Sequence, residues 1–256
     1  MALVKTKGLV IRERPYREQG KMLTIFTEKE GKVNAIAHNA KGVRSQLAES
    51  TQLFAYSNFN YYKGKNFANI NNADSIHSFY KLRDDLKKMT LGSYILELVD
   101  LLYEWYQGDA QTLRLIIHAL YYLDECQKGN LLGILVSLQL KLSILNGIHP
   151  KFDGCSNCGS EENIFYFSHE AGGVFCNNCR DQKGYSRKIS TEARRLLHRF
   201  LREPLNMAKA HEPVDETIMQ EAFILMNAYL SDYLNKTIRS YQMYLELFKE
   251  NTDANL

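Results

Sequence analysis

Four cysteines constrain this chain more than any other feature of its sequence. They form two pairs, Cys155-Ser-Asn-Cys158 and Cys176-Asn-Asn-Cys179, with seventeen residues between the pairs. Two residues between paired cysteines let the backbone turn tightly enough for both sulfurs to face one ion, and this spacing is typical of zinc sites. Zinc held by four thiolates is tetrahedral and keeps no position for water or substrate. The motif therefore predicts one structural zinc ion.

Other roles for the cysteines stay open from sequence alone. Two disulfides would require an oxidising compartment, and His149 or His169 is near enough in the sequence to replace one cysteine as a ligand. The fifth cysteine, Cys126, falls in an apolar helical pattern and is interpreted as a small buried residue. We expect the four-thiolate zinc site because both pairs have the spacing of zinc knuckles.

Several classes of enzyme are excluded because their sequence motifs are absent. The sequence contains no phosphate-binding Gly-x4-Gly-Lys-Ser/Thr loop, no Gly-x-Gly-x-x-Gly and no Gly-x-Ser-x-Gly. None of its histidines begins the His-x-Glu of a zinc deaminase. Its apolar stretches are too short to span a bilayer, and charges near the N-terminus argue against a signal peptide. We therefore expect a cytoplasmic binding protein rather than an enzyme, with no catalytic residues.

The charge of the chain is unevenly distributed. Residues 1–80 contain 12 Lys and Arg against 6 Asp and Glu, whereas residues 81–256 contain 20 against 23. A basic first segment suggests contact with a polyanion, and a solvated basic surface is the alternative.

The first 80 residues have the pattern of short strands separated by turns. Apolar and β-branched runs predict five strands, over residues 4–11, 21–27, 32–38, 53–62 and 67–73. Glu28-Lys-Glu-Gly31 joins the second and third as a hairpin. Five strands in so short a basic and aromatic segment predict an OB-fold β-barrel. We therefore predict the β part of an α+β fold, an OB-fold barrel domain over residues 1–80.

Residues 81–256 have a helical period. Apolar residues at three- and four-residue spacing predict helices over 91–105, 113–123 and 131–145, a bundle whose last helix ends at Gly147. Ser190 and Asp215 are expected to cap two later helices, and a polar tail follows the second of these. We predict an α-helical bundle domain over 81–256, with a zinc-binding segment inserted at 150–186.

Basic side chains in the barrel segment are the candidates for nucleic-acid contacts. They lie around the first turn, in the loop after the third strand and beside the later turn: Arg12, Arg14, Arg17, Lys21, Lys41, Arg44, Lys63 and Lys65. OB-folds follow a phosphate backbone with such loops and stack bases on aromatic side chains. The aromatic candidates are Tyr56, Tyr61, Tyr62 and Phe67. Each of these rings could equally belong to the barrel core.

A second basic surface follows the cysteine segment. Arg195, Arg199 and Arg202 lie on the polar side of the helix that Ser190 begins. Such a stripe is either a solvated helix face or a docking surface for DNA or an acidic peptide.

The order of these parts resembles one known family. Gly8-Leu-Val-Ile11, Tyr16-Arg-Glu18, Phe26-Thr-Glu-Lys-Glu-Gly31 and Lys41-Gly-Val-Arg-Ser45, followed by helices interrupted by four cysteines, are similar to the bacterial recombination mediator RecO. The resemblance covers essentially the whole chain. It rests on the N-terminal phrases taken together, because paired-cysteine knuckles occur in many families.

The resemblance implies a DNA repair and recombination function. A RecO-like protein binds single- and double-stranded DNA, anneals complementary strands, and works with RecR to load RecA onto DNA coated by single-stranded-DNA-binding protein. It would be cytoplasmic and associate with the nucleoid during repair. Carried over by position, Lys41 and Arg44 match the DNA-contact loop of the family's barrel, and the four cysteines match its zinc segment. Zinc would support the fold, because family members differ in whether they keep those cysteines.

Two other functions are compatible with the same residues. One is a zinc-stabilised scaffold that holds an acidic partner tail on Arg195, Arg199 and Arg202 and has little affinity for DNA. The other is an RNA-binding OB protein, which would depend on the 2′-hydroxyl of its ligand.

Overall fold

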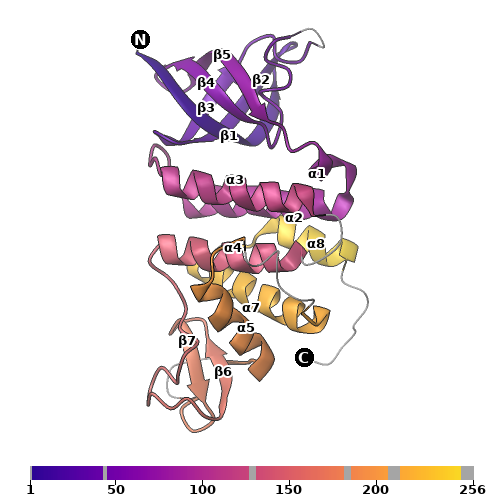
Figure 1. The fold of residues 1–256 in the computed structure, drawn as a ribbon. Coiled ribbons are helices and arrows are strands. Elements are labelled where there is room, and N and C mark those ends of the chain that lie inside the picture. Colours follow the sequence, from indigo (N-terminus) through magenta and orange to yellow (C-terminus); the bar gives the residue numbers. More distant parts are fainter. Residues whose placement is uncertain (1, 43–44, 127–130, 182–185, 207–213, 249–256) are drawn as a thin grey trace. The chain divides into compact units, whose positions relative to one another are not determined.

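The fold is that of a computed structural model, which describes residues 2–42, 45–126, 131–181, 186–206 and 214–248 (Figure 1). Two compact units are present, one containing residues 1–124 together with the residues from 247 on, and the other residues 125–246. The division into domains at residue 80 stays a prediction, because it concerns a boundary inside the first of these units. Within the described ranges, no helix is both long and apolar enough to cross a bilayer.

The first unit begins with a closed five-stranded barrel, as the sequence predicts. Its strands are β1 (Leu3–Tyr16), β2 (Gly20–Thr27), β3 (Gly31–Ala37), β4 (Tyr56–Tyr62) and β5 (Ala68–His77). They follow the order β1-β2-β3-β5-β4, in which β3 and β5 are parallel and the other pairs antiparallel. A five-stranded barrel closed in this way is the OB architecture.

Strand β1 closes the barrel because it is long enough to pair on both sides. Its first half pairs with β4 through Leu3–Leu9, and its second half pairs with β2 through Gly8–Tyr16. The register shifts between Val10 and Arg12, a bulge that bends the strand from one partner to the other. The strand therefore runs further than residue 11, and Arg12 and Arg14 lie in it rather than in the first turn.

The barrel core consists of inward-facing apolar side chains from all five strands. Among the fully buried ones are Val10, Ile25, Ala35, Phe59 and Tyr61. Tyr61 is an aromatic candidate that the barrel encloses: its hydroxyl donates to Glu30 Oε2 at 2.7 Å. Burial, and then the bond to this carboxylate, raise the pKa of Tyr61 far above its usual value. Its ring is thus part of the core and has no free face for a base.

Three helices follow the barrel in the first unit, which also contains the last two described residues, Leu247 and Phe248. They are α1 (Lys81–Asp84), α2 (Leu86–Leu102) and α3 (Ala110–Glu125, whose last residue belongs to the second unit). Asp85 caps α2 by accepting from the Lys88 backbone N–H at 3.0 Å. The prediction that the α2 pattern continues to Trp105 is wrong. The helix ends at Leu102, and Trp105 lies in the following loop with 40% of its surface exposed.

The second unit is built around α4 (Leu131–Leu145), whose bounds match the predicted helix. It packs against α5 (Thr191–Arg202) and α7 (Glu216–Leu234). Most residues of α4 are buried, which explains why its apolar pattern covers more than one face. The predicted caps are confirmed. Ser190 Oγ accepts from Ala193 N at 3.0 Å, and Asp215 Oδ1 accepts from Thr217 N at 2.8 Å.

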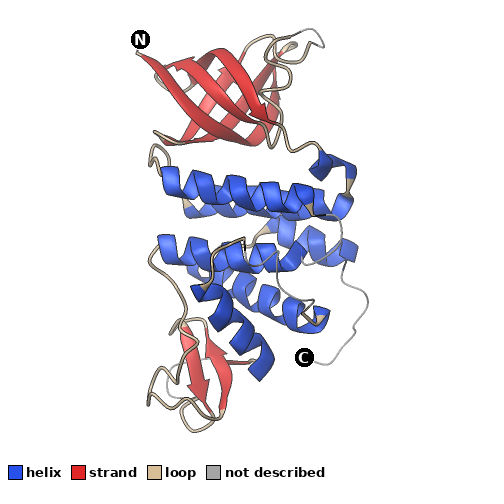
Figure 2. Cartoon of the chain, in the orientation of Figure 1, coloured by secondary structure: helices blue, strands red, loops and turns tan. Residues whose placement is uncertain are grey.

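Two features of the C-terminal half, a small sheet and a final helix, were not predicted. The cysteine segment contains a small sheet of β6 (Ile164–Ser168), β7 (Gly173–Cys176) and β8 (Arg187–Lys188), in the order β7-β6-β8 (Figure 2). The expected polar tail instead begins with α8 (Arg239–Phe248), on which Ser240 and Tyr244 are buried. Tyr241 and Tyr244 both contact the Phe223 ring edge-on at 5.6 Å, so tertiary packing holds α8 despite its sparse apolar pattern.

Candidate metal centre and nucleic-acid interface

The four cysteines of the motif come together at one point of the small sheet. Their sulfur atoms all lie within 4.8 Å of one another. Cys176 ends β7 and Cys179 lies in the turn that follows, whereas Cys155 and Cys158 belong to the loop before β6. Ser156 N, in the first knuckle, donates to Val174 O of β7 at 2.8 Å, so that this knuckle lies beside the strand that ends at Cys176.

Backbone hydrogen bonds form each knuckle. In the first, Gly159 N donates to Cys155 O at 2.8 Å, and Gly159 has a φ of +75°, a conformation that favours glycine. In the second, Cys179 N donates to Cys176 O at 3.0 Å. Between them, the Asn157 amide lies 3.4 Å from the sulfur of Cys179. The two short turns thus direct four sulfurs toward a common centre.

Opposing effects act on the pKa values of two thiols in the cluster, Cys155 and Cys179. Burial raises the pKa of Cys155, but backbone N–H groups of Cys158, Cys176 and Asn157 oppose it, and the net effect lowers this pKa to about 6. For Cys179, the Asn157 amide lowers the pKa, whereas burial and the neighbouring sulfurs raise it to about 11. The thiolate of Cys179 is therefore disfavoured unless a cation offsets the charge around it.

The geometry of the cluster fits a metal ion. Four sulfurs at about 2.3 Å from a zinc ion lie about 3.8 Å apart in a regular tetrahedron. The sulfurs of Cys158 and Cys176 are 3.8 Å apart. All four cysteines are free, and this separation is far longer than the roughly 2.05 Å of a disulfide bond. The cysteines are thus close enough to hold one metal ion.

Neither alternative histidine belongs to the cluster. Nδ1 of His169 lies 2.5 Å from an Asp232 carboxylate oxygen on α7, so that this nitrogen is engaged elsewhere. His149 is exposed, and the metal-binding group found in the described part of the chain consists of the four cysteines. Cys126 is buried, as interpreted from its apolar surroundings.

Three of the predicted basic residues of the barrel are engaged in ion pairs within the protein. Arg12 lies 2.5 Å from Asp100 of α2, and Lys63 forms an ion pair with Glu30. Lys21 is buried, 3.4 Å from Glu13 on the neighbouring strand. An acidic partner already neutralises each of these cations, which makes them less available to phosphate.

The other described basic candidates are exposed. Arg14 lies near the end of β1, Arg17 is in the β1–β2 turn, Lys41 follows β3 and Lys65 lies in the β4–β5 turn. The structure brings two of them together. The Lys41 ammonium donates to the backbone oxygens of Arg17 and Glu18 at 3.0 and 3.2 Å. Arg44 lies outside the described residues.

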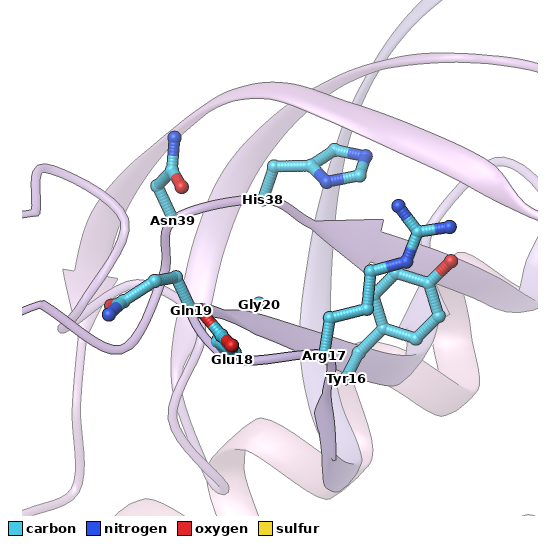
Figure 3. A pocket seen from close by; sticks show the side chains of 7 residues that line it. All are labelled: Tyr16, Arg17, Glu18, Gln19, Gly20, His38 and Asn39. Atoms are coloured by element: carbon cyan, nitrogen blue, oxygen red, sulfur yellow. The ribbon is translucent and has the colours of Figure 1, made fainter.

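A hollow of about 400 Å³ is open at this hairpin end of the barrel (Figure 3). Its lining comes from the β1–β2 turn and from the end of β3: Tyr16, Arg17, Glu18, Gln19, Gly20, His38 and Asn39. Of these residues, the sequence predicted only Arg17 as a nucleic-acid contact. Tyr16 and His38 are far apart in the sequence, so only strand pairing could have indicated that their rings are neighbours.

The predicted docking arginines all lie on α5. Arg195, Arg199 and Arg202 are exposed, and the Arg199 guanidinium lies 5.6 Å from the centre of the Phe200 ring. The helix buries its opposite face through Ala193, Leu196, Leu197 and Phe200. The second unit thus presents a cationic helix face.

Comparison with known proteins gives one consistent result. Residues 1–79 match the family model described as the N-terminal part of recombination protein O, and residues 83–242 match the model of its C-terminal part. The chain is 34% identical to the DNA repair protein RecO of Alkaliphilus metalliredigens, over 94% of this chain and 93% of that one. It is 32% identical to the protein of the same name from Clostridium novyi, over 95% and 94%. It is 30% identical to the DNA repair protein RecO of Acetivibrio thermocellus, over 92% of this chain and 94% of that one.

Proposed function

The chain belongs to the RecO family of DNA repair proteins, and we propose that it is a non-enzymatic recombination mediator that binds and anneals DNA strands. In this proposal it binds single- and double-stranded DNA. Together with RecR, it helps to load RecA onto DNA coated by single-stranded-DNA-binding protein.

One observation carries the DNA-binding part of this proposal. Arg17 and Lys41, from two different loops, converge at the open hairpin end of the barrel, where the Lys41 ammonium holds the turn that bears Arg17. Arg14 is exposed on the strand that leads into the same turn. Cations held at one end of an OB barrel, without acidic side chains bound to them, are suited to a phosphate backbone.

Salt dependence tests this interface. Each phosphate contact made with a single strand contributes a slope of about 0.7 to the fall of log affinity with log salt. The double variant Arg17→Ala, Lys41→Ala should therefore bind an oligonucleotide more weakly at low salt, with a slope reduced by about 1.4. Fluorescence anisotropy at several salt concentrations measures both quantities.

A control for the loss of positive charge as such uses an exposed lysine far along the sequence. Lys236→Ala removes one positive charge from the turn after α7 and should leave the slope unchanged. If the double variant behaved like this control, the hairpin end would not be the DNA interface. An unmodified protein that failed to bind DNA even at low salt would contradict the proposed function itself.

The arginines of α5 support a place for an acidic protein partner. We place the acidic tail of the single-stranded-DNA-binding protein on Arg195, Arg199 and Arg202. Each exposed guanidinium group can bind one carboxylate through two parallel hydrogen bonds. Strand annealing on DNA coated with that protein tests this assignment. Replacing the three arginines with alanine should slow annealing of coated DNA and leave annealing of bare DNA unchanged. An equal loss on both substrates would remove α5 from partner binding.

The cysteine cluster is proposed to hold one zinc ion. Zinc would supply a tetrahedral crosslink between the knuckles at Cys155 and Cys176. Four protein ligands complete its coordination, so the ion would stabilise the fold without contacting DNA.

A further inference from the structure

The hollow at the hairpin end of the barrel has one aromatic side and one polar side. The rings of Tyr16 and His38 meet edge-to-face with centres 6.3 Å apart. The Arg17 guanidinium lies 5.2 Å from the centre of the Tyr16 ring. Figure 3 shows Tyr16 and Arg17 together on one side, with the Gln19 and Asn39 amides on the other. A volume of about 400 Å³ lies in the range of small-ligand pockets.

The backbone around the hollow is held in a defined shape. Arg17 and Asn39 both adopt left-handed conformations, with φ of 52° and 53°. Besides the two bonds from its ammonium, Lys41 donates its backbone N–H to Gln19 O at 3.1 Å. A Cβ atom at Gly20 would lie 2.8 Å from Tyr16 O, so that no other residue fits this position without movement. Non-glycine residues held in left-handed conformations occur often at ligand-binding sites.

We propose that this hollow takes one unpaired nucleotide of a DNA single strand. The base would lie against Tyr16 and His38, and its phosphate would bind the Arg17 guanidinium on the same side of the hollow, on the turn that Lys41 holds. Gln19 and Asn39 offer amide donors and acceptors to the edge of the base, and the Glu18 carboxylate can accept from an exocyclic amino group. This inference rests on the proposed DNA binding. It adds a site that an unpaired base can enter and a base within a duplex cannot.

The chemistry of the lining favours an unpaired base over other occupants. Each base has a π-face, so stacking on aromatic rings works with any sequence. A base within a duplex is covered on both faces by its neighbours and cannot enter without being unstacked. A free phosphate would use Arg17 and Lys41 but would leave the aromatic rings without a role.

Abasic DNA separates the base from the backbone in a test. Binding of a twelve-residue oligothymidylate should be compared with binding of a twelve-residue strand lacking all bases, at one salt concentration. The unmodified protein should prefer the strand with bases by about tenfold, the contribution of one stacked base. Tyr16→Leu together with His38→Ala should lose most of this preference but bind the abasic strand as before.

Two control variants distinguish loss of stacking from a general loss of structure. Tyr16→Phe retains the ring and should keep the preference, whereas Tyr233→Ala removes an exposed tyrosine of α7 and should change nothing. If the double variant kept the full preference, or lost affinity for a duplex by the same factor as for the single strand, the inference would be wrong. Complete absence of DNA binding by the unmodified protein would instead contradict the proposed function.

Discussion

The cysteine cluster and the hairpin hollow both bring ligand-type side chains together, but they differ in what those side chains can still bind. At the cluster, four sulfurs within 4.8 Å face one point and can complete the coordination of an ion among themselves. At the hollow, Arg17 and the rings of Tyr16 and His38 line an open volume, and Lys41 holds the turn that bears Arg17. A closed set of ligands stabilises a fold, whereas an open set can receive a molecule from outside.

A similar difference separates the cations of the barrel. Lys32 and Arg12 both reach Asp100 of α2, so their charges serve the fold. Arg14, Arg17 and Lys41 are exposed on the same barrel and have no such carboxylate partner among the described contacts. Positive charge in the sequence therefore has two functions here. Substitutions at the cluster test the first comparison, and substitutions at Lys32, Arg12 and Arg14 test the second.

The largest effect is expected at the cluster. Cys176→Ser should abolish stoichiometric zinc binding and lower the stability of the second unit by more than about 4 kcal/mol, because loss of a structural metal is among the most damaging substitutions. The melting temperature should fall by roughly 10 °C. Zinc released to a chromophoric chelator and thermal unfolding measure the two effects. Cys126→Ser, which changes the cysteine outside the cluster, should keep the zinc.

DNA binding distinguishes a structural ion from a DNA-contacting one. Cys176→Ser protein that stays folded at low temperature should bind an oligonucleotide with an unchanged salt slope. A folded, zinc-free variant with a reduced slope would show that the metal module contacts the phosphate backbone.

The next effect is expected at Lys32, a cation used by the fold. Its ammonium lies 2.6 Å from Asp100 O and 3.1 Å from Asp100 Oδ1, and it lies 4.8 Å from the centre of the Trp105 ring. Because Lys32 is almost fully buried, Lys32→Met should cost about 3 kcal/mol by leaving a buried carboxylate with one partner fewer. Urea unfolding followed by circular dichroism measures this loss. The exposed neighbour Lys29→Met should change stability little, and equal effects of the two would contradict the assignment.

A smaller effect is expected from the amide beside the cluster. Asn157→Ala removes the donor that lies 3.4 Å from the sulfur of Cys179 and should weaken zinc binding about tenfold, as is usual for partners of metal ligands. Competition with a chelator of known affinity measures the change. Asn178, exposed in the other knuckle, provides the control, and Asn178→Ala should bind zinc normally. If both variants behaved alike, the amide would have no part in the site.

Features set by neighbouring residues could be predicted from the sequence. The knuckles at Cys155 and Cys176, the caps at Ser190 and Asp215 and the hairpin at Glu28–Gly31 all depend on interactions within a few residues. The five strands were predicted for the same reason, although β1 runs to Tyr16 because its pairing with β2 continues past the bulge.

Features set by distant residues could not be predicted. No local pattern indicates that Asp100 neutralises Arg12, or that strand pairing places His38 beside Tyr16. Helix α8 was missed because its packing on Phe223 stabilises it more than its own sequence does. Basic residues could thus be identified as a group, but their division into cations with and without a carboxylate partner required the fold.

The smallest effect is expected where the two kinds of cation lie on one strand. Arg12 pairs with Asp100, whereas Arg14, two residues further along β1, is exposed without an ion pair among the described contacts. A cation that is paired with a carboxylate must break that ion pair before it can bind a phosphate. Such a cation therefore contributes little to the release of counterions from DNA. Arg12→Ala should cost at most about 1 kcal/mol of stability, since Arg12 is partly exposed and Lys32 still holds Asp100, and should leave the salt slope unchanged. Arg14→Ala should lower the slope by about 0.7 without changing stability. Anisotropy titrations measure the slope of both variants, and urea unfolding measures their stability. A reduced slope for Arg12→Ala, with no change for Arg14→Ala, would contradict this interpretation.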